Sequence, residues 1–183
     1  AIKVIKNSRR FDNSYKIEIE INEILNKLHN DNILYMIEHF KDFSHKFLVF
    51  ELWGENLYSF YKTNIDYDYL NFGYQILSGL TEIHKYQIIH ADLKPENILI
   101  KNNVLKICDF GSGFFEKDQK YYTYIQSRYY RSSEVILNKL ITCKADVWSF
   151  ACILYELYYK KPLFLANNYK DLVIKIINFI GYP

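Results

Sequence analysis

The chain has 183 residues, of which 50% are hydrophobic and 18% are aromatic. This is enough apolar material for one domain, or for two small lobes, and it excludes an intrinsically disordered chain. The formal net charge is only +2 and the basic residues are scattered. We therefore expect no nucleic acid and no membrane surface as a partner. No apolar run approaches the roughly 20 residues that a transmembrane helix needs.

The cysteine pattern indicates a reducing compartment. Cys108, Cys143 and Cys152 form no Cys-x-x-Cys pair, and no histidine is spaced to complete a zinc site. Residues 1–6 do not have the features of a signal peptide. We therefore expect free thiols and an intracellular protein, in the cytoplasm or the nucleus. Because no initiator methionine is present, we also expect the sequence to be an excerpt of a longer protein.

The first third of the chain is predicted to be rich in strands. Residues 1–6 alternate between apolar and polar, as a half-buried strand does. Apolar residues at helical spacing then predict an amphipathic helix over residues 14–28, with Ser14 as a possible N-cap. Residues 33–39 and 47–50 are typical of two further strands. Gly54 ends this pattern.

The remaining two thirds are predicted to be mainly helical. Apolar periodicity predicts helices over residues 68–86, 144–159 and 171–180, the second of them ended by Pro162. Short strands are expected near residues 98–100 and 105–107. A loop rich in Gly, Ser and Tyr follows over about 111–127. The expected fold class is therefore α+β.

Two short motifs suggest that the chain binds a metal and a nucleotide. The run His-Ala-Asp-Leu-Lys-Pro-Glu-Asn covers residues 90–97, and Asp-Phe-Gly follows at 109–111. A triphosphate is polyanionic, so an enzyme that uses it must hold divalent cations with oxygen ligands. Asn97 and Asp109 supply an amide oxygen and a carboxylate. A loop before one strand and a loop after its neighbour would bring the two motifs together.

The same motifs supply candidate catalytic groups. Asp92 is placed to orient an incoming hydroxyl group and to accept its proton. Lys94 is placed to balance the charge on a moving phosphoryl group. A single aspartate near a histidine is usually part of a turn or a salt bridge, and an isolated Asp-Phe-Gly is usually a turn. It is the ordered set with these spacings that favours phosphoryl transfer.

These motifs resemble the signatures of eukaryotic protein kinases. Within that family the chain is most similar to the CMGC group, in the branch of dual-specificity tyrosine-regulated and homeodomain-interacting kinases (DYRK/HIPK). The resemblance runs through the whole chain, and the segments that carry it are 90–99, 109–112 and 122–137. It implies a bilobal protein-kinase-like α+β fold. Residues 1–52 would be a β-rich N-lobe remnant, from the strand lysine to the hinge, and residues 53–183 a mainly helical C-lobe, to about the helix that the family calls αG.

The resemblance also implies ATP and Mg²⁺ as cofactors and a protein as substrate. The residues that match the family's catalytic and metal-binding positions are Asp92, Lys94, Asn97 and Asp109. Lys3 matches the strand lysine that contacts the nucleotide phosphates, although a lysine at such a place is otherwise usually solvated surface. Its partner is Glu18 or Glu20, which lie on roughly opposite sides of the predicted helix. We favour Glu18, even though it leaves Asn22 at a position where the family has an apolar residue.

The hinge between the lobes matches residues 50–53, with Phe50 as the gatekeeper. The positions that would contact the nucleotide are the backbone of Glu51 and Trp53 at the adenine edge, Asn56 near the ribose, and Ala1 and Leu99 on either side of the adenine ring. The alternative is that Phe50, Leu52 and Trp53 are ordinary core residues, and the two roles could also be combined.

The Tyr-rich loop matches the activation segment of the family. The resemblance implies autophosphorylation of Tyr124, with Arg128 and Arg131 close enough in sequence to bind the phosphate. A bare Tyr-x-Tyr pair is otherwise usually just two aromatic side chains. Glu134 and Asp146 match structural positions, the latter bracing the backbone of the catalytic loop.

The sequence departs from the family at several positions. Ala91 stands where many kinases have Arg, Ser133 replaces a Pro and Ala151 replaces a Gly. No Gly-rich phosphate-covering loop precedes Lys3, so we expect the domain to be incomplete at both ends.

The predicted function is transfer of the γ-phosphoryl group of ATP to Ser or Thr of a protein, with autophosphorylation on an activation-loop Tyr. The alternative is a truncated or pseudokinase interaction module without turnover. A small-molecule phosphotransferase is a third reading, but it would not be expected to carry residues 127–134.

Overall fold

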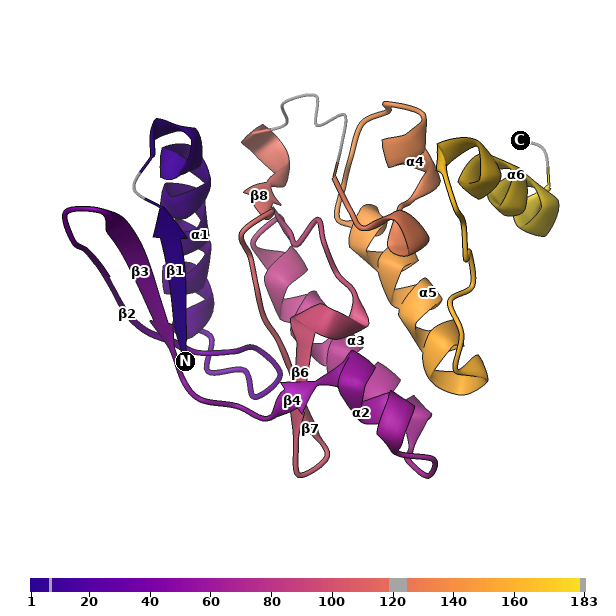
Figure 1. The fold of residues 1–183 in the computed structure, drawn as a ribbon, viewed down its shortest axis with the longest axis horizontal. Helices are drawn as coiled ribbons and strands as arrows, with labels where there is room; N and C mark the ends of the chain where they lie inside the picture. The colour runs from indigo at the N-terminus through magenta and orange to yellow at the C-terminus, as the bar shows by residue number, and fades with distance from the viewer. Residues whose placement is uncertain (7, 119–124, 182–183) are drawn as a thin grey trace.

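The computed structural model describes residues 1–6, 8–118 and 125–181 (Figure 1). The short N-terminal strands and α1 lie at one side of the molecule, α3 lies in the middle, and α4, α5 and α6 lie at the other side. In the described part of the chain, no helix is long and apolar enough to cross a membrane. The α+β class predicted from the sequence is confirmed.

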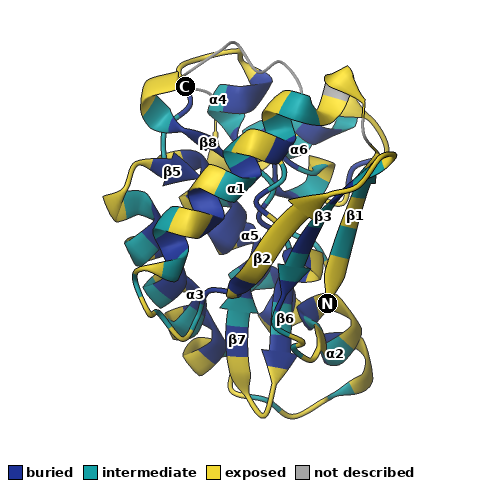
Figure 2. Ribbon diagram, turned by 90° about the vertical axis from the view of Figure 1, so that its left-hand side faces the viewer, coloured by how far each residue is buried: buried dark blue, intermediate teal, exposed yellow. Residues whose placement is uncertain are grey.

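The N-terminal part is a three-stranded antiparallel sheet covered by one helix. Its strands are β1 (Ile2–Lys6), β2 (Met36–Lys41) and β3 (His45–Phe50), in the order β1-β3-β2. In β3 every second residue is buried, so its apolar residues Leu48 and Phe50 share one face. Tyr15 of α1 (Asp12–Asn26) belongs to the same buried cluster. Figure 2 shows the exposed side of α1 turned away from the sheet.

Ser14 is not the N-cap of the first helix, and this prediction is wrong. A 3-10 turn, η1 (Arg9–Phe11), runs directly into α1, so the helix begins at Asp12 with Phe11 in the cap position. The Ser14 hydroxyl donates instead to the Phe11 carbonyl oxygen at 3.2 Å. Because the turn supplies the entry geometry, no polar cap marks the start of the helix in the sequence.

The rest of the chain is built around α3 (Tyr69–Lys85) and α5 (Lys144–Tyr159), which pack against each other. Asp68 caps α3 by accepting a hydrogen bond from the Asn71 backbone N–H at 2.9 Å. α6 (Tyr169–Ile180) begins two residues before its predicted start and is capped by Asn168. One large apolar cluster contains buried residues of all three helices.

Two small sheets connect the sheet region to the helices. The first sheet has the strand order β4-β6-β7, with β4 (Glu55–Asn56), β6 (Ile98–Lys101) and β7 (Val104–Ile107). The second sheet pairs β5 (Ile88–Ile89) with β8 (Phe114–Phe115). The sequence predicted β6 and β7 but not the two-residue strands. It also missed α2 (Leu57–Thr63) and α4 (Ser133–Ile136), which are too short to show a period.

Hairpin register decides where the two motifs meet. Ile98 of β6 pairs with Ile107 of β7, so the residue before β6 lies opposite the residue after β7. The Cys108 N–H accordingly donates to the Asn97 carbonyl oxygen at 3.0 Å. This hairpin carries the predicted metal ligands Asn97 and Asp109 to the same edge of the sheet.

The three cysteines Cys108, Cys143 and Cys152 are free thiols, as the sequence predicted. Burial raises the pKa of each of them to about 12.

Replacing Gly54 with alanine is expected to lower the free energy of unfolding by about 2 kcal/mol or more. A Cβ at this position would lie 1.8 Å from the Ile100 carbonyl oxygen, so the backbone next to the β4–β6 pair would have to move. Chemical denaturation measures the change. Gly73→Ala in α3 is the matched control, because the nearest atom to its Cβ would be the end of the flexible Leu154 side chain, at 3.0 Å, and no backbone atom is close. Equal stability of the two variants would contradict the expectation.

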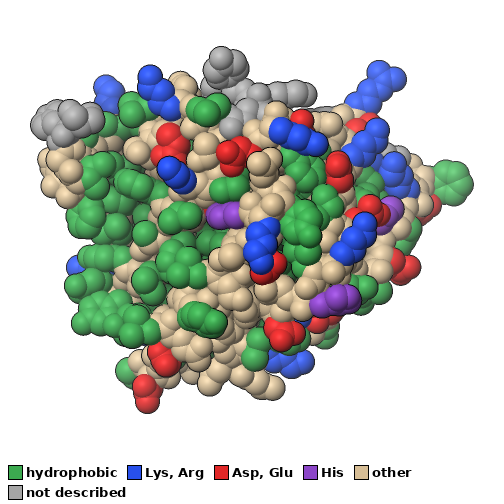
Figure 3. Space-filling model, turned by 180° about the vertical axis from the view of Figure 1, so that it is seen from behind, with side chains coloured by type: hydrophobic (Ala, Val, Ile, Leu, Met, Phe, Trp, Pro, Cys, Tyr) green, Lys and Arg blue, Asp and Glu red, His purple; other side chains and the backbone are tan. Residues whose placement is uncertain are grey.

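The back face of the molecule has an uneven surface. Figure 3 shows hydrophobic side chains gathered over the half that belongs to α4–α6, while acidic and basic side chains are interspersed over the other half. The exposed large hydrophobic residues of α6 include Ile174, Phe179 and Ile180.

Candidate active site

Asp146 fixes the backbone that precedes the catalytic loop. It lies in the first turn of α5 and is completely buried. Its carboxylate accepts hydrogen bonds from the backbone N–H groups of His90 at 2.8 Å and Ala91 at 3.0 Å, and also contacts His84 Nε2 at 3.0 Å. Ala91 has a left-handed backbone (φ 63°), which costs energy for a residue with a side chain. The buried carboxylate compensates for that cost.

His90 joins the two motifs through its ring. Its Nε2 lies 3.0 Å from the Cys108 carbonyl oxygen, and its Nδ1 lies 3.3 Å from the backbone nitrogen of Asp92. The Asp92 N–H can only donate, so Nδ1 accepts and Nε2 carries the proton in this arrangement. The ring also packs against Phe110, with ring centroids 5.0 Å apart. His90 therefore ties the loop that carries Asp92 to the loop that carries Asp109.

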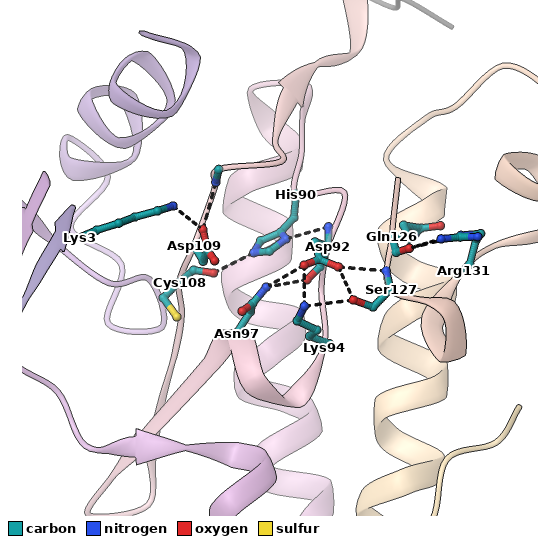
Figure 4. A network of polar contacts seen from close by, with 11 residues as sticks. Lys3, His90, Asp92, Lys94, Asn97, Cys108, Asp109, Gln126, Ser127 and Arg131 are labelled. Carbon is teal, nitrogen blue, oxygen red and sulfur yellow. Dashed lines mark hydrogen bonds and ion pairs between the residues drawn. The ribbon is translucent and has the colours of Figure 1, made fainter. Parts of the chain in front are cut away.

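Asp92 is the centre of the polar network (Figure 4). One carboxylate oxygen, Oδ1, accepts hydrogen bonds from the Ser127 N–H at 3.0 Å and the Ser127 hydroxyl at 2.8 Å. The other, Oδ2, lies 2.7 Å from Lys94 Nζ and 3.3 Å from Asn97 Nδ2. Lys94 Nζ also donates to the Ser127 hydroxyl at 3.0 Å. These contacts hold the carboxylate in one orientation.

Asn97 presents its amide oxygen away from Asp92. It ends a 3-10 turn, η2 (Pro95–Asn97), and its Nδ2 donates to the Asp92 carbonyl oxygen at 2.9 Å as well as to the carboxylate. Because the amide nitrogen faces Asp92, the oxygen is left for another ligand. Asp109, whose backbone is also left-handed (φ 65°), lies just beyond the end of the neighbouring strand β7.

Lys3 pairs with Glu18 and Asp109 at the boundary between the sheet and the helices. Its Nζ lies 2.6 Å from Glu18 Oε1 and 2.7 Å from Asp109 Oδ1. Glu20, the other candidate from the sequence, is exposed on α1. The buried Asn22 is accommodated because its Nδ2 donates to the Glu18 carbonyl oxygen at 2.7 Å. The structure thus pairs Lys3 with Glu18.

The ion cluster is electrostatically favourable for Lys3 and Asp109. Burial alone would lower the pKa of Lys3, but the carboxylates of Glu18 and Asp109 outweigh it and raise the pKa. Burial opposes ionisation of Asp109, and the Lys3 ammonium outweighs it, so the pKa of Asp109 is lowered. Burial raises the pKa of Glu18 against the opposing effect of Lys3. Asp109 is therefore held as a carboxylate, the form that binds a cation.

Gly111→Ala is expected to weaken the nucleotide binding that the family resemblance implies by about tenfold, the effect of disturbing a charge-assisted contact worth about 1.5–3 kcal/mol. A Cβ at residue 111 would lie 2.8 Å from Lys3 Nζ, 3.1 Å from Asp109 Oδ1 and 3.3 Å from Glu18 Oε2. It would therefore push the ion cluster apart. Calorimetric titration with Mg-ATP measures the loss, with Ser112→Ala in the same loop as the control. Unchanged affinity would show that the cluster tolerates the methyl group.

The predicted hinge residues lie between the sheet and β4. The Phe50 N–H donates to the Ala1 carbonyl oxygen at 2.8 Å, and the Glu51 N–H donates to the Tyr35 carbonyl oxygen at 3.0 Å. Trp53 packs beneath Lys106, whose Nζ is 4.3 Å from the ring centroid. Trp53 and Leu99 are both partly buried against the apolar cluster that contains Phe50. Phe50 is a core residue, so the core and hinge interpretations of this residue are compatible. Leu52 is 77% exposed, so the core interpretation is wrong for that residue.

Asn56 has a structural role that the sequence did not suggest. Its side-chain oxygen accepts a hydrogen bond from the Ser59 N–H at 2.9 Å and caps α2. This contact engages the oxygen and leaves the amide nitrogen for the predicted ribose contact.

Tyr124 lies outside the described residues. The two arginines predicted to bind its phosphate both contact backbone carbonyl oxygens: Arg128 those of Ala166 and Asn167, and Arg131 those of Ile125 and Gln126. Arg131 is buried and Arg128 is exposed.

Ser127 and Gln126 are site residues that sequence reasoning missed. Ser127 binds both Asp92 and Lys94, as described above. Gln126 has a left-handed backbone (φ 61°), and its N–H donates to the Ala91 carbonyl oxygen at 3.0 Å. Its buried side chain donates to Ser149 Oγ at 3.0 Å. Both residues lie in the segment that carried the family resemblance, but a spacing pattern does not reveal contacts with a loop 35 residues away.

Comparison with known proteins agrees with this geometry. The family model described as "Protein kinase domain" matches residues 1–180. The chain belongs to the protein kinase family. Its relatives include "Probable serine/threonine-protein kinase dyrk2" of Dictyostelium discoideum (43% identical) and "Dual specificity tyrosine-phosphorylation-regulated kinase 3" of Homo sapiens (40% identical). "Serine/threonine-protein kinase ppk15" of Schizosaccharomyces pombe is 40% identical. The DYRK-like branch predicted from the motifs is confirmed.

These kinases are much longer than the chain. All of the chain aligns with each of them, but it spans only 21% of the Dictyostelium protein, 33% of the human protein and 36% of the Schizosaccharomyces protein.

Ala91, at a position where many kinases have Arg, is completely buried. It belongs to an apolar cluster with Ile89, Phe114 and Val135. At this position the loop therefore contributes an apolar core residue in place of a cation.

The residues at the hairpin edge fit a magnesium ion. The amide oxygen of Asn97 is left open by the contacts of its nitrogen, and Asp109 is held ionised by Lys3. Hard oxygen donors of this kind are the ligands that Mg²⁺ prefers, usually together with water and substrate phosphates.

Proposed function

We propose that this kinase domain transfers the γ-phosphoryl group of ATP to a Ser or Thr hydroxyl of a protein. One observation carries the proposal: Lys3, the motif that contains Asp92 and Asn97, and Asp109 come from three separate places in the sequence and converge on the junction between the sheet and the helices. A structural role would not require an open amide oxygen beside an ionised carboxylate. We place the boundary between the lobes at residues 52–53.

The roles of the chain's own residues follow from their contacts. Asp92 accepts the proton of the substrate hydroxyl while the hydroxyl oxygen attacks the γ-phosphorus. The bond between the γ-phosphorus and the oxygen that bridges it to the β-phosphate breaks, and ADP leaves. Lys94, held between Asp92 and Ser127, balances the charge on the moving phosphoryl group. Lys3 binds the α- and β-phosphates. Asn97 and Asp109 would hold Mg²⁺, which would neutralise phosphate charge when bound.

The experiment that tests this function is a transfer assay. Full-length protein is incubated with Mg-ATP and a peptide library containing a central Ser or Thr, and phosphopeptides are identified by mass spectrometry. We expect phosphopeptides. Nucleotide binding without any transfer would instead support an interaction module without turnover.

We further propose that Tyr124 is autophosphorylated. The support is the match of residues 122–137 to the activation segment and the DYRK-like relatives of the chain. Mass spectrometry of full-length protein made in bacteria, which leaves no other eukaryotic kinase to act, is expected to detect phosphotyrosine at 124. The Asp92→Asn protein prepared in the same way should lack it. Phosphate on both proteins, or on neither, would contradict the proposal.

A further inference from the structure

A cavity of about 530 Å³ adjoins the catalytic loop on the side away from the ion cluster. Lys94 and Ser127, which both contact Asp92, form part of its wall. The cavity extends from there between α2 and the end of α5. A peptide whose hydroxyl reaches Asp92 would therefore lie next to this cavity.

The cavity wall is rich in cations. Five cationic side chains contribute to it, against two carboxylates, and the cations are Lys62, Lys94, Arg128, Lys160 and Lys161. Among the residues that the structure describes, only Lys94 of these five forms an ion pair, with Asp92. The other four are exposed at the surface. A basic wall of this kind favours an anionic ligand.

Three of the cations are held in place by neutral groups. Arg128 donates from one terminal nitrogen to the carbonyl oxygens of Asn167, at 2.9 Å, and Ala166, at 3.3 Å. Lys160 has a left-handed backbone (φ 58°) and its Nζ lies 3.5 Å from the centroid of the Tyr67 ring. Lys62 Nζ lies 5.4 Å from the ring of Tyr61. Carbonyl oxygens and aromatic rings position these charges without neutralising them.

The two carboxylates do not cancel this charge. Glu156 is completely buried, and its two oxygens accept hydrogen bonds from the hydroxyls of Tyr61 and Tyr130. Burial raises the pKa of Glu156 against the opposing effect of these two hydrogen bonds, and so disfavours its ionised form. Glu96 is exposed to solvent and is the one carboxylate of the wall that is open to a basic ligand. Four exposed cations, three of them held in place, therefore outweigh one accessible carboxylate.

We propose that this cavity is a substrate subsite for an anionic side chain, a carboxylate or a phosphorylated residue, close to the phosphorylated hydroxyl. The inference rests on the proposed kinase function, because it assigns the cavity to the protein substrate. The bound anion would contact Arg128, Lys161 and Lys62 across the cavity. Arg128 can do so with the donors that its two carbonyl contacts leave over.

Peptide binding tests the subsite independently of turnover. Four sets of fluorescent peptides share a central Ser. Each set uses one of Glu, phosphoserine, Gln or Arg, and places that residue at each flanking position in turn. Their affinities for the full-length protein are measured by fluorescence anisotropy. We expect a flanking position at which phosphoserine and Glu bind about tenfold tighter than Gln, with the advantage shrinking as salt is raised. A phosphoserine effect without a Glu effect would identify a dedicated phosphate site, and the reverse a carboxylate site.

Charge reversal locates the effect in the cavity. Lys161→Glu, alone and together with Lys62→Glu, is expected to remove the preference for the anionic peptide and leave the affinity of the Gln peptide unchanged. Lys170→Glu is the matched control, because Lys170 is an exposed lysine at the start of α6 that is not part of the cavity wall. It makes the same change in net charge and should retain the preference.

The outcomes separate this inference from the proposed function. Equal binding of the Glu, phosphoserine and Gln peptides, tighter binding of the Arg peptide, or an equal loss in Lys161→Glu and Lys170→Glu would each overturn the subsite. Phosphoryl transfer to the neutral peptide would still support the kinase function in all three cases. Absence of transfer with an intact anionic preference would overturn the kinase function and leave the binding site standing.

Discussion

Asp92→Asn is expected to lower the rate of phosphoryl transfer by about a hundred- to ten-thousand-fold, the range of general-base contributions. An amide cannot accept the hydroxyl proton. It also places an NH₂ group where the carboxylate now accepts from Ser127 on one side or contacts Lys94 on the other. The affinity for Mg-ATP should change little, because the nucleotide contacts are assigned to Lys3, Asn97 and Asp109. Steady-state transfer and calorimetric nucleotide titration on the same protein measure the two quantities.

Asp66→Asn is the control for this experiment. Asp66 is exposed in the loop before α3, and the substitution makes the same chemical change away from the site. It should leave both quantities unaltered. Retained transfer in Asp92→Asn would refute the role of Asp92 as the base, and a large loss of nucleotide affinity would show that the substitution disturbs the whole site.

Asp146→Ala is expected to lower the free energy of unfolding by about 2 kcal/mol or more, because each buried donor left without a partner costs about 1–3 kcal/mol. The substitution leaves the backbone N–H groups of His90 and Ala91, both completely buried residues, without this acceptor, and it removes the contact with His84. It also releases the left-handed backbone of Ala91. Urea denaturation followed by circular dichroism measures the loss.

Two further variants sharpen this experiment. Asp146→Asn keeps one acceptor oxygen for the two N–H groups, so its loss of stability should lie between those of the wild type and the alanine variant. Asp66→Ala controls for removal of an aspartate as such and should be nearly neutral, as surface substitutions usually are. If Asp146→Ala is as stable as Asp66→Ala, the buried carboxylate does not brace the loop.

Local patterns in the sequence predicted most of the long elements. The apolar periodicity of 68–86 and 144–159 matches α3 and α5 to within a residue, since a helix that buries one face must repeat its apolar residues. The same reasoning fails where tertiary contacts decide. β4, β5 and β8 have two residues each and exist because a partner strand lies beside them. The start of α1 depends on the preceding turn, which no capping residue announces.

The candidate site, too, was predicted from the sequence only in part. Residues 92, 94, 97 and 109 were found from their types and spacing, because phosphoryl transfer restricts both. Ser127 was not found, because its role comes only from a 2.8 Å approach to Asp92 across 35 residues of chain. Gly111 and His90 belong to the motifs, but their physical roles depend on tertiary contacts. Gly111 leaves room for Lys3, and the His90 ring contacts the Cys108 carbonyl oxygen.

The sequence by itself determined the family, the fold class and the identity of the candidate catalytic and metal-binding groups, since these depend on local periodicity and on ordered motifs. Only the tertiary structure decided that Lys3 pairs with Glu18 and not Glu20, and that Ser127 holds Asp92. It also decided that cations from α2, from η4 (Arg128–Tyr130) and from the residues that follow α5 line one cavity with Lys94. Contacts of this kind join residues far apart in the chain. They depend on how helices and strands pack against one another, which no local pattern of residues encodes.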